Sequence, residues 1–296
     1  MGILKYVDIL SAVREGRRTF SISPDTIVTP LARETAESKG IEIMEGFMRK
    51  PLIAGNWKMN MTIEQSVSMV ESLKEKVKDV TAVEIMIAPP YTALSAVAQA
   101  VKDSNIQLGA QNLHFEKSGA YTGEISPGML KEIGCNWVII GHSERRQYFG
   151  CTDEIVNRKL KTAVSEGLKP VVCIGETLQE RETGKTFDIL RKQLDGGLKD
   201  LSEAEQNALT VAYEPVWAIG TGKTATSEQA EEAHSFIRQK LSEMYGQEFS
   251  ESVRILYGGS VKPANISELM KQNNLDGGLV GGASLDPDSF ASIIKF

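Results

Sequence analysis

The sequence predicts an α/β fold: a (β/α)8 barrel preceded by a small N-terminal α/β extension. Two observations indicate the barrel. Eight short apolar runs alternate with helical patterns from residue 49 to the end of the chain. This span of about 248 residues also matches the ~250 residues typical of such a barrel. A doubly wound parallel sheet is the alternative, but no GxGxxG motif follows the first apolar run.

The apolar runs are the predicted strands of the barrel. They lie at residues 52–54, 83–88, 106–110, 137–140, 170–174, 210–213 and 253–257, with a last unit at 277–282. Helices are predicted to follow at about residues 62–78, 92–102, 126–133, 153–166, 186–198, 227–245 and 263–272. The loop at 111–126 is long for a strand–helix connection, and loops of this length are often functional or bind a partner.

The first part of the chain does not share this alternation. We therefore predict a separate extension over residues 1–47 and a barrel over residues 48–296. The spacing of Leu4, Val7 and Leu10 favours a helix near the start of the extension.

The second half of the extension has clear helix boundaries. Thr29-Pro30 has the form of an N-cap followed by proline, and Lys39-Gly40 that of the matching stop, with a short strand expected at 41–43. A segment this small holds little apolar area, so we expect it to pack either on the main domain or on a partner. Our hypothesis for it is a docking or assembly arm. An inert appendage is the alternative, because chain termini tolerate additions.

The composition limits the class of protein. Hydrophobic residues make up 41% of the chain and charged residues 24%, as in a globular protein with a sizeable core. The formal net charge of -6, without a basic block, argues against nucleic acid and against an anionic membrane surface as partners. No apolar run reaches the ~18–20 residues of a membrane helix, and no signal-peptide pattern is present. Three widely spaced cysteines and only three histidines indicate reduced thiols, a cytoplasmic location and no His-rich metal site.

Polar side chains follow several strands at the face where a barrel collects its chemistry. Asn56 and Lys58 come after the first strand, two residues apart, so both side chains project the same way. His142 follows the fourth strand at a helix start, where the helix dipole disfavours the imidazolium form. Glu214 ends the sixth strand, and a glycine-containing stretch at 215–225 behind it could close as a lid. Each group alone is more often structural, so their common location carries the functional interpretation.

Glycines follow the last two strands of the predicted barrel. Gly258-Gly259-Ser260 and Gly281-Gly282 would expose backbone N–H groups to an anion, and barrels commonly bind phosphate in these two loops. A carboxylate, a neutral imidazole, a lysine and a phosphate cradle together suit proton abstraction beside a carbonyl in a small phosphorylated substrate. His114 and His234 lack such placement and are interpreted as structural or surface residues.

These residues lie in motifs that resemble triosephosphate isomerase over essentially all of residues 49–296. The matching motifs are AGNWKMN (54–60), QNLHFEKSGAYTGEIS (111–126), IIGHSERRQYFG (139–150), AYEPVWAIGTGKTAT (212–226), YGGSV (257–261) and LVGGASL (279–285). The resemblance implies a TIM barrel that interconverts dihydroxyacetone phosphate and D-glyceraldehyde 3-phosphate in glycolysis and gluconeogenesis. It also implies neither a metal nor an organic cofactor.

The resemblance implies a role for each site residue. Glu214 is implied as the base that moves the proton, His142 as the neutral electrophile at the enediolate oxygens, and Lys58 as the cation facing the substrate; this carboxylate–imidazole pairing is a known property of the family. The implied substrate contacts, chiefly to phosphate, are Asn56, Lys58, Gly220, Ser260, Gly281 and Gly282. The implied supporting residues are Ser143, Glu144 and Cys173.

Family members are usually homodimers, and the resemblance extends to this contact. Loop 111–126 would insert beside the site of the second copy, with Gln111 and Thr122 at the matching positions. Cys151 departs from the family, which usually carries a glutamate there in a polar network near the subunit interface. Two alternatives to an active isomerase are a catalytically inactive barrel that binds a phosphate ligand and a different phosphate-binding barrel enzyme.

Overall fold

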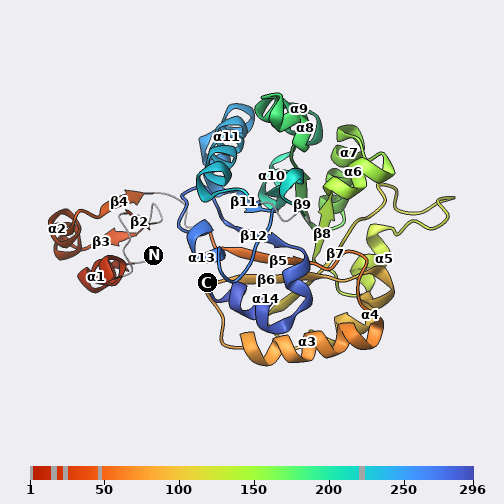
Figure 1. Cartoon of the computed structure of the whole chain (residues 1–296), viewed down its shortest axis with the longest axis horizontal. Helices are drawn as coiled ribbons and strands as arrows, with labels where there is room; N and C mark the ends of the chain where they lie inside the picture. The colour runs from red at the N-terminus through yellow and green to blue at the C-terminus, as the bar shows by residue number, and fades with distance from the viewer. Residues whose placement is uncertain (1–2, 15–18, 23–25, 46–48, 220–223) are drawn as a thin grey trace. The chain divides into compact units, whose positions relative to one another are not determined.

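The computed structural model describes residues 3–14, 19–22, 26–45, 49–219 and 224–296. The chain divides into two compact units, Met1–Arg49 and Lys50–Phe296, which we call the N-terminal unit and the barrel. Figure 1 shows the elements of both units along the chain. Every helix in the described ranges is too short or too polar to span a membrane.

Eight parallel strands close the barrel, which confirms the predicted fold class (Figure 1). The strands are β5 (Leu52–Asn56), β6 (Glu84–Ala88), β7 (Ile106–Ala110), β8 (Trp137–Ile140), β9 (Lys169–Ile174), β10 (Thr210–Tyr213), β11 (Arg254–Tyr257) and β12 (Gly277–Val280). Each strand pairs with the next along the chain, and β12 returns to pair with β5, with Gly277 opposite Leu52. All eight strands therefore end at the same face.

Helices follow the strands around the outside of the barrel. The longer ones are α3 (Ile63–Val77), α4 (Tyr91–Ala100), α7 (Asp153–Ser165), α9 (Thr186–Gly197), α11 (Ser227–Tyr245) and α14 (Pro287–Ile294). The shorter ones are α5 (Pro127–Glu132), α6 (Ser143–Phe149), α8 (Leu178–Glu182), α10 (Glu203–Ala208), η1 (Val216–Ala218), α12 (Gln247–Ser252), α13 (Ile266–Leu269) and η2 (Gly282–Leu285).

The sequence prediction differs from the structure mainly in short elements. Helices α8, α10, α12 and α14 were not predicted, since a five- to eight-residue helix shows little periodicity. The helix predicted over 263–272 is only the four-residue α13. Helix α14 had local signals, because Asp286 caps it and Pro287 opens it.

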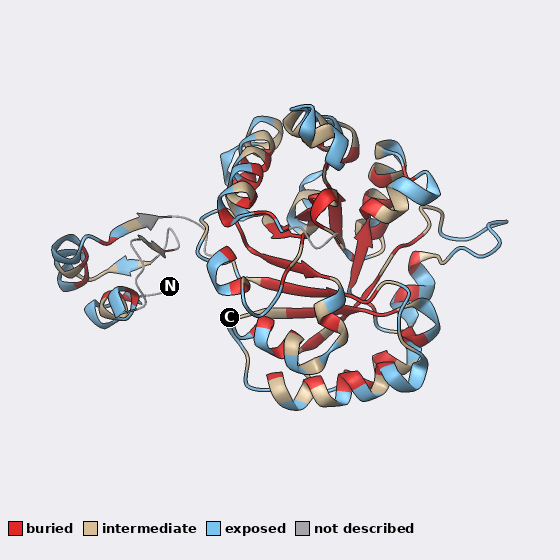
Figure 2. Ribbon diagram, viewed as in Figure 1, coloured by how far each residue is buried: buried red, intermediate tan, exposed pale blue. Residues whose placement is uncertain are grey.

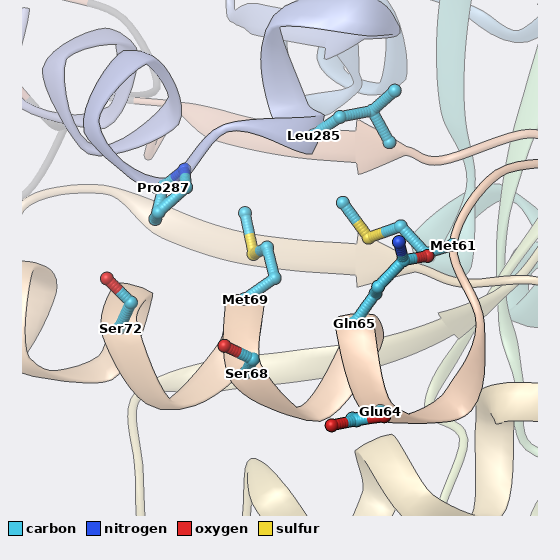
Figure 3. A pocket seen from close by; sticks show the side chains of 8 residues that line it. All are labelled: Met61, Glu64, Gln65, Ser68, Met69, Ser72, Leu285 and Pro287. Atoms are coloured by element: carbon cyan, nitrogen blue, oxygen red, sulfur yellow. The ribbon is translucent and has the colours of Figure 1, made fainter.

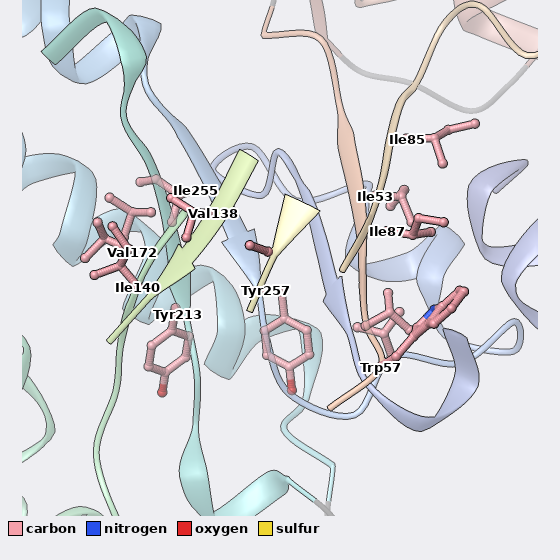
Figure 4. Packing of buried hydrophobic residues seen from close by; sticks show 14 of the residues in the cluster. Ile53, Trp57, Ile85, Ile87, Val138, Ile140, Val172, Tyr213, Ile255 and Tyr257 are labelled. Carbon is pink, nitrogen blue, oxygen red and sulfur yellow. The ribbon is translucent and has the colours of Figure 1, made fainter. Parts of the chain in front are cut away.

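The barrel strands are buried on both faces, as Figure 2 shows. Alternate residues point inward and outward, so Leu52 and Ala54 join a core inside the barrel while Ile53 joins the core beneath the helices. Figure 4 shows part of this outer core. The inner core leaves no room for a side chain at Gly109, where a Cβ atom would lie 2.6 Å from the sulfur of Met86.

The N-terminal unit consists of two β-α-β segments of the same design. The first is β1 (Ile3–Leu4), α1 (Tyr6–Arg14) and β2 (Thr19–Ile22), and the second is β3 (Ile27–Val28), α2 (Pro30–Lys39) and β4 (Glu42–Glu45). Strand β1 pairs with β3 and β2 with β4, both in parallel. The two segments therefore occupy equivalent places.

Helix α2 has the boundaries that the sequence predicts. Thr29 Oγ1 accepts a hydrogen bond from the N–H of Ala32, Pro30 opens the helix, and Gly40 ends it with a left-handed φ of 66°. The pairing of the two segments was not predicted, because strands of two to four residues give too weak a pattern.

Candidate active site

A cavity of about 330 Å³ lies at the carboxyl ends of the barrel strands. Seven of the predicted site residues line it: Asn56, Lys58, His142, Glu214, Ser260, Gly281 and Gly282. These residues come from the ends of β5, β8, β10, β11 and β12, so closure of the barrel brings them together. Gly220 lies outside the described residues.

The centre of the cavity is a buried carboxylate–imidazole pair. Glu214 Oε1 lies 2.9 Å from His142 Nε2, and Glu214 Oε2 accepts a hydrogen bond of 2.8 Å from the N–H of Ser143. Glu214 is 1% exposed and His142 is 5% exposed. Burying a carboxylate costs free energy unless it is paired and hydrogen-bonded, and here both of its oxygens have partners.

The start of α6 fixes the tautomer of His142. His142 is the N-cap of this helix, and its Nδ1 accepts the N–H of Glu144 at 3.3 Å. A ring nitrogen that accepts cannot carry a proton, so a neutral ring holds its proton on Nε2. This proton faces Glu214 and the cavity.

The pair shifts both protonation equilibria. Burial raises the pKa of Glu214, but the charge and hydrogen bond of His142, the Ser143 N–H and the charge of Lys58 together hold this pKa below its usual value. Glu214 is therefore ionised at neutral pH. Burial lowers the pKa of His142, but the carboxylates of Glu214 and Glu144 raise it above its usual value overall. This raised pKa depends on the Glu214 contact, so moving Glu214 away favours the neutral ring.

Lys58 occupies a strained backbone position beside this pair. Its φ of 53° lies in the left-handed region, which a residue with a Cβ atom adopts at some cost. Two contacts hold it there: its N–H donates to Asn56 Oδ1 at 3.1 Å, and its carbonyl accepts from Gln111 Nε2 at 2.8 Å. Its ammonium lies 2.6 Å from Glu144 Oε1. The sequence analysis assigned Gln111 only to a subunit contact and did not predict its hydrogen bond to the carbonyl of Lys58.

A second buried carboxylate anchors the start of the segment at 215–225. Glu176 is fully buried and accepts hydrogen bonds from Trp217 Nε1 at 2.9 Å and from the Tyr213 hydroxyl at 3.1 Å. Arg181 Nη1 lies 3.3 Å from the same carboxylate. Glu176 was not predicted as a functional residue. The available signal was an acid directly after a strand, at Gly175-Glu176, as for Glu214.

Glycines form the wall of the cavity on the side of β11 and β12. A Cβ atom at Gly259 would lie 2.2 Å from the Tyr257 hydroxyl, so only glycine fits there. A Cβ atom at Gly281 would lie 3.6 Å from Lys58 Cε, which places the lysine stem close to this glycine. Peptide N–H groups without neighbouring side chains leave space for an anion beside the Lys58 ammonium.

Cys173 lies behind Glu214 and is fully buried. Burial and the nearby Glu214 charge raise the pKa of its thiol, so it is no nucleophile. The two other histidines lie away from the cavity. His114 stacks between Phe115 and Tyr121, and His234 is buried and hydrogen-bonded to a backbone carbonyl, with a pKa lowered by burial to about 3.

Other candidate sites have no comparable chemistry. A groove of about 590 Å³ between α3 and the segment Leu285–Pro287 is shown in Figure 3. Glu64 is the one ionisable side chain in its lining, so it offers no acid–base pair. Within the described ranges, no group of three or more His, Cys, Asp or Glu residues could hold a metal ion.

The fold and the cavity define a class of protein: a barrel enzyme with a carboxylate–imidazole pair for proton transfer beside an anion-binding wall. The family model for triosephosphate isomerase matches residues 51–296. The chain belongs to the triosephosphate isomerase family, which interconverts dihydroxyacetone phosphate and glyceraldehyde 3-phosphate in glycolysis.

Curated relatives match the same part of the chain. The triosephosphate isomerase of Endomicrobium trichonymphae is 57% identical over 249 residues, which cover 84% of this chain and 99% of the relative. Those of Geobacter metallireducens and Alkaliphilus oremlandii are 56% and 53% identical over 249 residues, again 84% of this chain and 99% and 100% of the relatives. The N-terminal unit lies outside these matches.

Proposed function

We propose that Glu214, His142 and Lys58 carry out the triose phosphate isomerisation in this chain. The observation that carries the proposal is the 2.9 Å contact between Glu214 Oε1 and His142 Nε2 at the wall of the cavity. The carboxylate is ionised, as a base must be, and the imidazole presents a single N–H to the same space.

The proton transfer follows from this geometry. With dihydroxyacetone phosphate bound, Glu214 leaves the Ser143 N–H and removes a proton from C1, the carbon that bears the hydroxyl group. The electron pair of the broken C–H bond forms the C1–C2 double bond of an enediolate, and charge develops on the former carbonyl oxygen. Return of the same proton to C2 gives glyceraldehyde 3-phosphate. The reaction needs no oxidant, because the proton and electron pair remain within the substrate.

His142 and Lys58 act on the oxygens during this transfer. Once Glu214 moves to the substrate, the largest cause that raises the pKa of His142 is lost, which favours the neutral ring. Its Nε2 can then give its proton to the former carbonyl oxygen and take the proton of the C1 hydroxyl in return, so that protonation of C2 leaves an aldehyde at C1. The Lys58 ammonium adds positive charge where the enediolate is negative. Glu144 supports both, because it contacts Lys58 Nζ and its N–H holds His142 Nδ1.

Phosphate binding positions the three-carbon substrate. We propose Asn56, Ser260, Gly281 and Gly282 as contacts to the substrate, together with Gly220, which lies outside the described residues. Closure of residues 215–225 would exclude water and protect the enediolate from loss of phosphate. The bonds of Trp217 and Tyr213 to Glu176 fix the start of that segment. Cys173 packs behind the base as a supporting residue.

Glu214→Gln tests the proposal. The amide cannot accept the carbon-bound proton, so kcat should fall by at least ~10²–10⁴-fold, the range for a positioned general base. The measurement is a coupled assay with glyceraldehyde 3-phosphate, with Glu75→Gln on the exposed side of α3 as the matched control. An unchanged turnover in Glu214→Gln would end the assignment. No turnover in the wild-type chain would instead favour a catalytically inactive barrel.

We also propose that two barrels pair through loop 111–126. Large apolar side chains are exposed near this loop and near the cavity: Met59 (94%), Tyr121 (44%), Tyr148 (68%) and Phe149 (66%). Gln111 and Thr122 would face the second copy. A sedimentation experiment on Tyr121→Asp should show a smaller particle than the wild type, and equal masses would refute this contact.

Cys151 marks a weak point in the proposed pairing. It is buried near Lys159. The ammonium of Lys159 donates a hydrogen bond of 2.7 Å to Asn112 Oδ1, which lies in loop 111–126. Burial lowers the pKa of Lys159, and the negative charge of a carboxylate at position 151 would oppose this shift. Cys151→Glu should therefore stabilise the pair of barrels against dilution, and a weaker pair would contradict this account.

For the rest of the chain, we propose that residues 1–47 form a docking or assembly arm and residues 48–296 the isomerase. The division of the structure into Met1–Arg49 and Lys50–Phe296 supports this boundary. We propose a cytoplasmic location, where the substrates of glycolysis occur, and cell fractionation with an isomerase assay would test it.

A further inference from the structure

The N-terminal unit exposes more apolar surface than its size explains. It supplies six of the fifteen large hydrophobic residues that are exposed in the described chain, although it holds only about a sixth of all residues. The six are Ile3, Tyr6, Val7, Val13, Ile27 and Leu31. Single exposed apolar residues are ordinary, but a concentration of them marks an interaction site.

Helix α1 carries three apolar residues along one exposed side. At about 100° per residue, Tyr6, Leu10 and Val13 fall within ~60° of one another. Tyr6 is 44% exposed, Val13 is 36% exposed and Leu10 is half-buried. Ile9 and Ala12 point into the core of the unit instead. We call Tyr6, Leu10 and Val13 the α1 stripe.

The internal repeat provides a control for the α1 stripe. Helix α2 occupies the equivalent place in the second segment, and Ala12 of α1 and Ala36 of α2 are both buried. Where α1 has its stripe, α2 has Pro30, Glu34 and Glu37, all exposed. The same fold therefore tolerates a charged, solvated surface at this place. An apolar stripe in one segment alone is not required by the unit itself.

We propose that the α1 stripe binds the α1 stripe of a second copy of this chain, with the two helices antiparallel about a two-fold axis. The spacing is self-complementary: Leu10 meets its own copy, and Tyr6 meets Val13 of the partner subunit. The stripe contains no charge, so it fits an apolar surface and not an acidic or basic one. Antiparallel helices also place opposite dipole ends side by side. Arg14 then lies near Tyr6 of the partner subunit, in reach of a cation–π contact.

The contact is small, and this determines how it would act. Helix α1 has nine residues, so its length is about 14 Å, and the buried area falls well below that of a standard stable interface. One contact alone is weak. A particle made of two barrels presents two stripes, so repeated weak contacts link such particles at high protein concentration. The linking of particles rests on the barrel pairing proposed above, whereas the contact between stripes concerns the extension alone and does not depend on the isomerase chemistry.

Sedimentation equilibrium on the full chain tests this contact. Two separate variants, Leu10→Glu and Leu10→Lys, place a negative and a positive charge at the centre of the stripe. The average mass of the wild type should rise with concentration, whereas each variant alone should stay at the smaller mass because like charges face each other. An equimolar mixture of the two variants should regain at least part of the association. Glu34→Lys, at the equivalent place on α2, is the matched control and should behave as the wild type.

Three results would overturn the proposal. The wild type could keep one mass up to about 100 µM, a concentration at which weak association is detectable. The stripe would then bind another protein or another surface of the same chain. Leu10→Glu could keep the larger mass, which would place association elsewhere. The mixed variants could fail to associate, which would exclude a contact of Leu10 with its copy. Isomerase activity of the same samples is read separately, so failure of the catalytic assignment remains distinguishable.

Discussion

The two units of this chain follow the same local rules and differ in how much they bury. Thr29 caps α2 in the N-terminal unit as Thr62 caps α3 in the barrel, each through a side-chain oxygen and a backbone N–H. The barrel strands, however, are covered inside by one core and outside by another. In the described part of the N-terminal unit, the strands pair in twos over seven buried hydrophobic residues, of which three are alanines.

This difference in buried area shows that the signals that form a helix are distinct from the interactions that stabilise the fold. Caps and spacing specify a helix equally well in both units, but buried apolar area supplies most of the free energy of folding, and it grows with domain size. The barrel can therefore hold buried charges such as Glu214 and Glu176, whereas every buried side chain among the described residues of the N-terminal unit is apolar. A unit with so little core gains from covering its exposed residues with a partner.

The largest expected effect on stability lies in the barrel, at a buried ion pair. Arg238 Nη2 lies 2.7 Å from Asp276 Oδ2, and both side chains are almost fully buried. Asp276→Asn removes this carboxylate charge from beside a buried guanidinium, so the free energy of unfolding should fall by ~3–5 kcal/mol in urea titrations. Glu75→Gln, which breaks an exposed pair, should cost less than ~1 kcal/mol. Equal effects of the two changes would contradict the role of burial.

The next effect tests the small core of the N-terminal unit. Ile9 is fully buried there, and Ile9→Ala should cost ~2–4 kcal/mol. A unit with so few buried residues should then unfold by itself, so that hydrogen exchange becomes fast over 3–45 and stays slow in the barrel. Leu31→Ala on the exposed side of α2 is the control and should leave exchange unchanged. A matching loss of isomerase activity in Ile9→Ala would show that the units are coupled.

A smaller effect concerns the pH dependence of the carboxylate–imidazole pair. The lowered pKa of Glu214 stabilises the fold above the unfolded carboxyl value of ~4.3, and this is lost as pH falls through the lowered pKa. The raised pKa of His142 stabilises the fold below ~6.5, and this is lost as pH rises through the raised pKa. The difference in unfolding free energy between wild type and Glu214→Gln should therefore be largest near pH 4.5–6.5, by about 1–2 kcal/mol. A flat difference from pH 3 to 9 would contradict this coupling.

The smallest effect is expected from removing the extension. Every predicted site residue lies in the barrel, and the curated relatives match it over 99–100% of their own length. A chain of residues 48–296 should therefore keep kcat and KM within about twofold of the full chain in the coupled assay. A tenfold loss would show that the N-terminal unit contributes to the site.

Local sequence signals were sufficient for the longer elements and for much of the site. Pro30 and Gly40 marked the ends of α2, and strand ends located Lys58, His142 and Glu214. The four unpredicted short helices carry too few residues for a period to appear. Gln111 and Glu176 were missed as supports of Lys58 and Trp217, because each acts on a residue distant in sequence.

The sequence by itself predicted the alternation of strands and helices, the ends of several longer helices and the presence of an acid and an imidazole at strand ends, because these depend on residue type and local spacing. Only the tertiary structure decided that Glu214 lies 2.9 Å from His142, that Gln111 and Asn56 hold Lys58 in a left-handed conformation, and that α1 has an uncovered apolar side. The physical reason is that distances, burial and pKa shifts arise from groups brought together by closure of the barrel and by pairing of the two N-terminal segments. Neither is encoded in the spacing along one strand or helix.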